Sequence, residues 1–160
     1  MNLWKKFLGI SLAVGLSIGM GSVLAFADTV SILDELTEEE TTADFAEDIS
    51  YYPARSNNLN FGSVKIQKVS DHEVVVYGLT QCHRKCSKVY LSLFLEKKGT
   101  DGYSTYKIWE YTANNATNLD KEICVLVPSG TYYRVRGYHA ASKDGVKEST
   151  STLTSGILIK

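Results

Sequence analysis

Residues 88–96 read Lys-Val-Tyr-Leu-Ser-Leu-Phe-Leu-Glu, and this stretch decides the fold class. Every second residue from Val89 to Leu95 is aliphatic, and the residues between them are Tyr, Ser and Phe. Successive side chains of a strand point to opposite faces, so this period of two predicts a strand with one buried face.

The same alternation recurs from Leu59 onward, and glycine-containing turns separate the segments. The expected strands are 62–69, 72–80, 88–96, 103–112, 119–127, 131–141 and 149–159, the last with a candidate interruption at Ser155-Gly156. Residues 82–86 and 114–118 are expected to be loops. About seven short strands without a helical period predict an all-β, antiparallel two-sheet sandwich, with a barrel as the alternative.

The first 27 residues have the organisation of a secretory signal peptide. Lys5 and Lys6 precede a run from Phe7 to Phe26 without an ionisable side chain, and the run ends at Ala25-Phe26-Ala27. This pattern predicts cleavage after Ala27, export from the cell and no membrane attachment afterwards. The run is about long enough to span a bilayer, so an uncleaved anchor is the alternative.

Charge divides the remaining chain into two parts. Residues 28–48 hold nine Asp or Glu and no Lys or Arg, whereas residues 49–160 hold fifteen Lys or Arg and nine acids. Blocks of like charge are usually solvated, which predicts an acidic flexible linker or propeptide at 28–54. One folded domain is expected at 55–160.

The basic excess of this domain favours anionic partners such as cell-wall polymers or acidic glycans. A nucleic-acid partner is not expected, since an exported chain carries no recognised binding motif for it. The acidic leader offers a competing role for the charge, because it would neutralise the basic face until it is cleaved or displaced.

Residues 127–137 read Val-Pro-Ser-Gly-Thr-Tyr-Tyr-Arg-Val-Arg-Gly and resemble the entry of the sixth strand in fibronectin type III domains. There, Pro-x-Thr precedes Tyr-x-Val-x-Val, and the resemblance implies an immunoglobulin-like sandwich with a tyrosine corner. Alternation with Val135 assigns the corner to Tyr133, with Tyr132 as the competitor. The chain departs from that pattern by one extra residue before the tyrosines.

A closer resemblance extends over residues 55–160. The segments that carry it are similar to an uncharacterised family of small exported domains in Gram-positive bacteria. They are Leu95-Glu96-Lys97-Lys98, Tyr103, Trp109, residues 132–139 and Glu148-Ser149-Thr150-Ser151. That resemblance implies secretion and a β-sandwich, and it supplies no catalytic residues.

Three cysteines are an odd number for an exported chain. Cys82 and Cys86 flank a basic loop tip and are the candidate disulfide, because oxidising compartments permit one. A metal site of Cys82, Cys86, His83 and Cys124 is the alternative. It is disfavoured because zinc pairs have two or four intervening residues more often than three, and because His83 directly follows Cys82; no metal and no cofactor are expected. Cys124 is expected to stay free.

Two arrangements would point to an enzyme, and neither is well supported. His139, Ser142 and Asp144 lie close only because a turn joins them, and nothing orients a nucleophile. The acids Glu96, Glu110 and Glu122 fall on strands with different facing, so a glycosidase pair is not indicated. No catalytic residue is assigned, and no enzymatic activity is expected.

Aromatic residues provide the remaining candidate site. Tyr132, Arg134, Arg136 and Tyr138 share one parity of their strand, opposite to Val135 and Gly137. Tyr and Arg are enriched in binding surfaces, so we expect these four residues to form an exposed ligand surface. Trp109 is expected to pack in the core, and Tyr103, Trp109 and Tyr111 to share one face.

The expected function is a secreted, non-catalytic binding or adhesion module that is either free outside the cell or associated with its surface. Its ligand would be a cell-envelope polymer, a glycan or a protein. The alternative is a small secreted effector or toxin-like protein whose acidic leader is a pro-segment.

Overall fold

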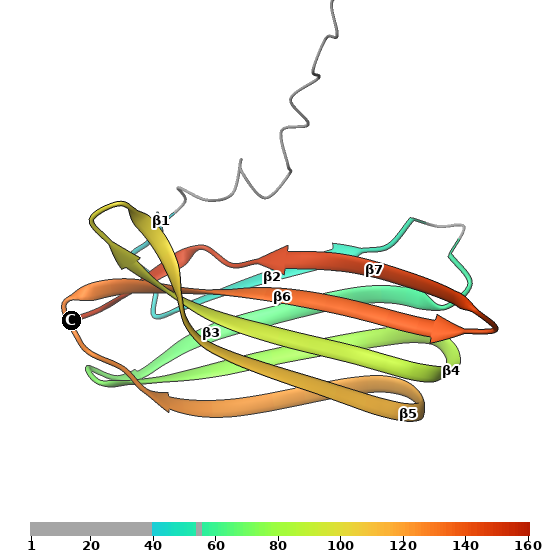
Figure 1. The fold of residues 1–160 in the computed structure, drawn as a ribbon. Helices are drawn as coiled ribbons and strands as arrows, with labels where there is room; N and C mark the ends of the chain where they lie inside the picture. The colour runs from blue at the N-terminus through green and yellow to red at the C-terminus, as the bar shows by residue number, and fades with distance from the viewer. Residues whose placement is uncertain (1–39, 54–55) are drawn as a thin grey trace, which may run out of the picture.

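The computed structural model describes residues 40–53 and 56–160. The regular elements of this part of the chain are all strands, which confirms the all-β class. They run lengthwise through an elongated molecule (Figure 1). The strands are β1 (Glu40–Thr41), β2 (Phe45–Tyr51), β3 (Leu59–Ser70), β4 (Glu73–Gly99), β5 (Gly102–Leu126), β6 (Thr131–Lys143), β7 (Val146–Leu153) and β8 (Gly156–Ile159). The interruption expected at Ser155-Gly156 is confirmed as the break between β7 and β8.

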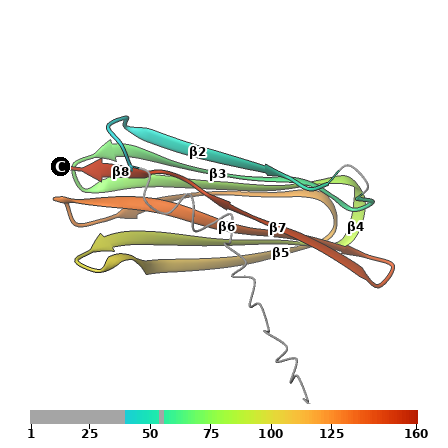
Figure 2. The same cartoon turned by 90° about the horizontal axis from the view of Figure 1, so that it is seen from above.

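All eight strands belong to one sheet in the order β1-β8-β6-β4-β3-β2, with β5 paired to β4 and β7 paired to β6. The sheet curls until β2 meets β7 (Figure 2). Two hydrogen bonds join these strands: Leu153 N–H donates to Asp48 Oδ2 at 2.8 Å, and the hydroxyls of Ser50 and Thr150 lie 2.7 Å apart. The result is a barrel-like, nearly closed sheet.

β4 and β5 are longer than expected because the strands continue through both predicted loops. Residues 73–82 of β4 pair with β3 and the end of β5, whereas residues 88–97 pair with β6 and the start of β5. The loop predictions at 82–86 and 114–118 are therefore wrong, since the chain stays extended and bends within the ladder. Gln81 opposes Asn118 and Cys86 opposes Ala116, so β4 bulges between these pairs.

The N-terminal part of the described chain belongs to the sheet. β1 pairs with β8 in parallel, and β2 pairs with β3 along its whole length. Both strands lie in the segment that the charge pattern indicated as a linker, and both are acidic. The predicted signal peptide and its cleavage site at Ala27 lie outside the described residues. Among the described residues, no helix is long and apolar enough to cross a membrane.

The core follows the alternation. Val89, Leu91, Leu93 and Leu95 are fully buried, as are Val135 on β6 and Ile66 on β3 in the same cluster. Trp109 and Tyr111 pack against this cluster from β5, which confirms the packing role expected for Trp109.

Candidate functional site

The outward side of β6 carries the four residues expected to form a ligand surface. Tyr133 and Val135 point inward and are fully buried, which turns Tyr132, Arg134, Arg136 and Tyr138 to the other side. Tyr132, Arg136 and Tyr138 are partly exposed. Arg134 differs from the expectation because only 7% of its surface is exposed.

Glu96 on β4 explains why Arg134 is buried. Its carboxylate accepts hydrogen bonds from Nε of Arg134 at 2.7 Å and Nε of Arg136 at 2.9 Å. Glu96 is itself buried. A buried charge is tolerated when it is paired and hydrogen-bonded, so Glu96 fixes both arginines in place.

Aromatic rings pack against the two arginines of this surface. The guanidinium of Arg134 lies 4.0 Å from the centroid of Tyr103, and that of Arg136 lies 4.5 Å from Phe94. Cations within about 6 Å of an aromatic face are attracted by the ring electrons.

Lys147 on β7 extends the pattern, because its Nζ lies 4.7 Å from the ring of Tyr90 and 5.6 Å from that of Tyr138. We call the whole surface the aromatic–basic face; it comprises Tyr90, Phe94, Tyr103, Tyr132, Arg134, Arg136, Tyr138 and Lys147.

Sequence reasoning did not find Phe94, Tyr90 and Lys147, although the outward parity of residues 88–96 carries a signal for the first two. Tyr103 was expected to share a face with Trp109 and Tyr111. A register shift in the β4–β5 ladder lies between Leu95 and Glu96, and it turns Tyr103 to the outward side. That expectation is therefore wrong for Tyr103, because one bulge reverses the parity of a strand.

One corner of the face holds a carboxylate from the N-terminal segment. Glu40 pairs with Lys98, and the hydroxyl of Tyr103 lies 3.5 Å from Oε1 of Glu40. Burial, together with this carboxylate, raises the pKa of Tyr103 to about 12, so the phenol stays protonated at neutral pH. The corner thus combines an ammonium group and a phenol around an acid.

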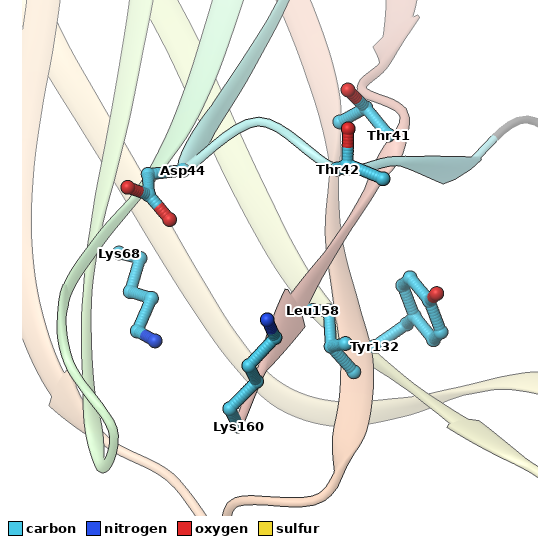
Figure 3. A pocket seen from close by; sticks show the side chains of 7 residues that line it. All are labelled: Thr41, Thr42, Asp44, Lys68, Tyr132, Leu158 and Lys160. Carbon is cyan, nitrogen blue, oxygen red and sulfur yellow. The ribbon is translucent and has the colours of Figure 1, made fainter.

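A small pocket borders the same end of the face. Its volume is about 180 Å³, and it is lined by Thr41, Thr42, Asp44, Lys68, Tyr132, Leu158 and Lys160 (Figure 3). Lys68 already forms a 2.8 Å ion pair with Asp71. Pockets for drug-sized ligands typically measure about 300–1,000 Å³, so this one has room for a small polar group only.

The cysteines occupy two different environments. Cys82 and Cys86 are free thiols buried in the core cluster, whereas Cys124 is exposed on β5 opposite Val75. Within residues 40–53 and 56–160, no three His, Cys, Asp or Glu side chains are grouped to hold a metal ion.

His139 lies away from the turn that brings Ser142 and Asp144 close to it in sequence. It is fully buried, with Nδ1 at 3.0 Å from the hydroxyl of Thr80 and Nε2 at 2.8 Å from that of Thr152. Burial lowers the pKa of His139 to about 4. The imidazole is therefore a neutral polar bridge between β4 and β7.

The three acids weighed as a glycosidase pair are spread over the sheet. Glu96 is committed to the two arginines, Glu110 lies opposite Ser92, and Glu122 lies opposite Tyr77.

The fold and this face define an all-β domain with a pre-ordered aromatic and cationic surface. The sequence matches the family of unknown function DUF6147 over residues 33–156, and the chain belongs to that family. No curated protein matches the sequence.

Proposed function

We propose that the protein is a secreted, non-catalytic binding or adhesion module whose aromatic–basic face engages a cell-envelope polymer, a glycan or a protein. The observation that carries this proposal is the fixed pair Arg134–Arg136, which Glu96 holds and which packs against Tyr103 and Phe94.

The chemistry of the face suits recognition of a ligand with both flat apolar surfaces and acidic groups. Aromatic rings offer contact area at a low conformational-entropy cost, and arginine donates to carboxylates or phosphates in a fork. Side chains that are already ordered lose less freedom on binding. Cross-strand aromatic packing alone would account for single pairs, at about 0.2–1 kcal/mol each. It does not require the cations to gather on the outward side.

We further infer that the curled sheet corresponds to the two layers of an immunoglobulin-like or fibronectin type III-like sandwich. The pairing of β4 supports this, because its first half joins β3 and its second half joins β6. The Tyr133 hydroxyl, which donates to Pro128 O at 2.8 Å, provides the tyrosine corner expected of such domains.

The acidic segment is better explained as part of the module than as a removable pro-segment. A cut near Tyr51 would remove β1 and β2, and with them the bonds from Asp48 and Ser50 to β7. This loss would open the nearly closed sheet. The contact of Glu40 with Lys98 leaves a smaller role for the leader, as an acidic cover for one corner of the face.

Binding to immobilised polysaccharides tests the proposal, with heparin as the anionic probe, dextran as the neutral one and cell-wall fragments as a third. Lys147→Gln removes a cation from the face without altering the Glu96 pairs. Arg136→Gln removes a second cation and leaves Arg134 as the arginine bonded to Glu96. We expect retention of the full chain on heparin or wall fragments, weakened about 10-fold by either variant.

Lys65→Gln is the matched control. The Nζ atom of Lys65 lies 5.3 Å from the ring centroid of Phe45 on the β2–β3 part of the sheet. Lys65→Gln therefore removes the same charge from an equivalent cation–aromatic pair elsewhere. Equal weakening by Lys65→Gln would show that only net charge matters, and would overturn the assignment of the face. If none of the three probes retains the chain, a pull-down from secreted and surface proteins, with the unmodified chain as bait, tests whether the ligand is a protein. If that captures nothing either, the proposed binding function is refuted.

A further inference from the structure

Cys82 and Cys86 stand at the two ends of the bulge in β4. From Gln81 to Cys86 the partner strand advances only from Asn118 to Ala116. Two residues of extended chain span about 7 Å, so the bulge brings Cys82 and Cys86 much closer than an extended strand would. Disulfides form between Cα atoms about 4.4–6.8 Å apart, a range this compression makes accessible.

The side chains of Cys82 and Cys86 both point into the core. Each is buried and each belongs to the core cluster. The Cys86 thiol donates to Arg84 O at 3.4 Å, and it lies near enough to Cys82 to help raise the pKa of that thiol. Cys124 is exposed and lies opposite Val75, outside this environment.

The three exposed residues between the two cysteines, His83-Arg84-Lys85, are held from both sides; we call them the tip of the bulge. His83 N–H donates to Asn58 O at 2.9 Å, and Arg84 donates to Asn58 Oδ1 at 3.2 Å. On the other side, Lys143 donates to Lys85 O at 3.2 Å. These contacts hold the bulge in the structure, in which both thiols are free.

We infer that Cys82 and Cys86 form an intrachain disulfide that clamps the exposed His83-Arg84-Lys85 tip when the protein meets an oxidant of the disulfide class. One cysteine thiolate attacks the small disulfide and releases one thiol. The second cysteine thiolate then attacks the mixed disulfide and releases the other thiol. One S–S bond forms in the protein, two S–H bonds are lost, and the small disulfide is reduced to two thiols.

Oxidation of the folded chain is expected to be slow. Burial, and then the neighbouring thiol of Cys86, raises the pKa of Cys82 to about 12, which leaves very little thiolate at neutral pH. The thiolate is the attacking species, so the reaction needs local opening of the bulge. Mild denaturant should therefore accelerate bridge formation.

Alkylation in denaturant tests the inference on the full chain after incubation with glutathione disulfide or with a reductant. The chain has three cysteines. Intact mass should show three alkylated thiols in the reduced sample. The oxidised sample should show a single modified thiol, which carries either the alkyl label or one glutathione. Peptide mapping should place the remaining label on Cys124, and the oxidised form should have the higher midpoint of thermal unfolding.

Two variants separate the pairings. Cys124→Ala should leave no alkylated thiol after oxidation. Cys86→Ala should leave two thiols that carry the alkyl label or glutathione and no bridge, and should show no rise of the thermal midpoint on oxidation. Three results in the unmodified chain would each overturn the inference. They are glutathione adducts on Cys82 or Cys86 in place of a bridge, three thiols still free after incubation with glutathione disulfide, and a bridge to Cys124.

Discussion

The hydroxyl of Tyr133 donates a 2.8 Å hydrogen bond to the backbone carbonyl of Pro128, five residues upstream. The bond ties the start of β6 to the turn that enters it, and the Tyr133 side chain is fully buried. Burial, and then the nearby Tyr106, raises the pKa of Tyr133 to about 12, so the phenol remains a donor at neutral pH. The alternation with Val135 predicted the corner at Tyr133 and not at the adjacent Tyr132.

Tyr133→Phe removes the donor and keeps the ring. We expect a loss of about 1 kcal/mol in the free energy of unfolding, the usual net contribution of one such hydrogen bond. Urea unfolding followed by fluorescence measures it. Tyr132→Phe is the matched control, since Tyr132 points outward and is partly exposed; it should change stability by less than about 0.5 kcal/mol. Equal losses in both variants would contradict the corner role.

Gly62→Ala should destabilise the domain because there is no room for a Cβ atom. A Cβ built at Gly62 would lie 2.2 Å from Cγ of the His139 ring. The ring is enclosed by its hydrogen bonds to Thr80 and Thr152 and has little freedom to move. We expect a loss of about 1–3 kcal/mol, the range for overpacked cores, measured by urea unfolding. At Gly99 the nearest atom to a built Cβ is 3.7 Å away, so Gly99→Ala should be near neutral; a matching loss there would refute the steric cause.

The sequence predicted the class of the fold because burial in a sheet has a local signature. The alternation of residues 88–96 follows from one face meeting the core, and that face is fully buried in the structure. The continuation of β4 through residues 82–86 has no such signature. It depends on a bulge whose residues pair across the ladder with a distant strand, and no local pattern encodes that partner.

The candidate site was predictable in part for the same reason. Residues 132–138 have a parity that places the arginines outward, and the structure confirms the orientation. The burial of Arg134 depends on Glu96, which lies on another strand, and on Tyr103, whose facing is set by a register shift. Long-range pairs and bulges are therefore where single-sequence reasoning ends. Residues 28–54 were expected to be an acidic linker or propeptide because of their charge, yet Asp48 of this segment binds the backbone of β7.

Glu148→Ala should loosen the loop that precedes β3. The Glu148 carboxylate accepts three consecutive backbone N–H groups, from Asn57 at 3.1 Å, Asn58 at 2.9 Å and Leu59 at 2.7 Å. Losing one partner of a buried donor costs about 1–3 kcal/mol, so we expect a loss in that range by urea unfolding. Hydrogen exchange at Asn58 and Leu59 should accelerate.

Glu122→Ala is the control for this change, because Glu122 is an exposed acid on β5 opposite Tyr77. It should leave both stability and exchange near those of the unmodified chain. Unchanged exchange at Asn58 and Leu59 in Glu148→Ala would show that the carboxylate does not anchor the loop.

The buried imidazole of His139 should make the domain lose stability in acid. Its pKa is lowered to about 4 by burial, whereas an unfolded histidine titrates near 6.5. As the pH falls from 6.5 to 4, the unfolded chain takes up a proton that the native state refuses, so the native state becomes less favoured. Above pH 6.5 both states are neutral at this residue and the effect is absent. The full shift corresponds to about 3 kcal/mol.

His139→Gln isolates this contribution, since glutamine does not titrate. The variant should be less stable at pH 7.5, because its amide fits the site between Thr80 and Thr152 less well than the ring. Its stability should nevertheless fall less steeply than that of the unmodified chain between pH 6.5 and 4, by urea unfolding at a series of pH values. His72→Gln, which changes an exposed histidine, should keep the original slope. Identical slopes for His139→Gln and the unmodified chain would mean that another group causes the acid sensitivity. They would also mean that the His139 imidazole takes up its proton as readily in the folded state as in the unfolded state.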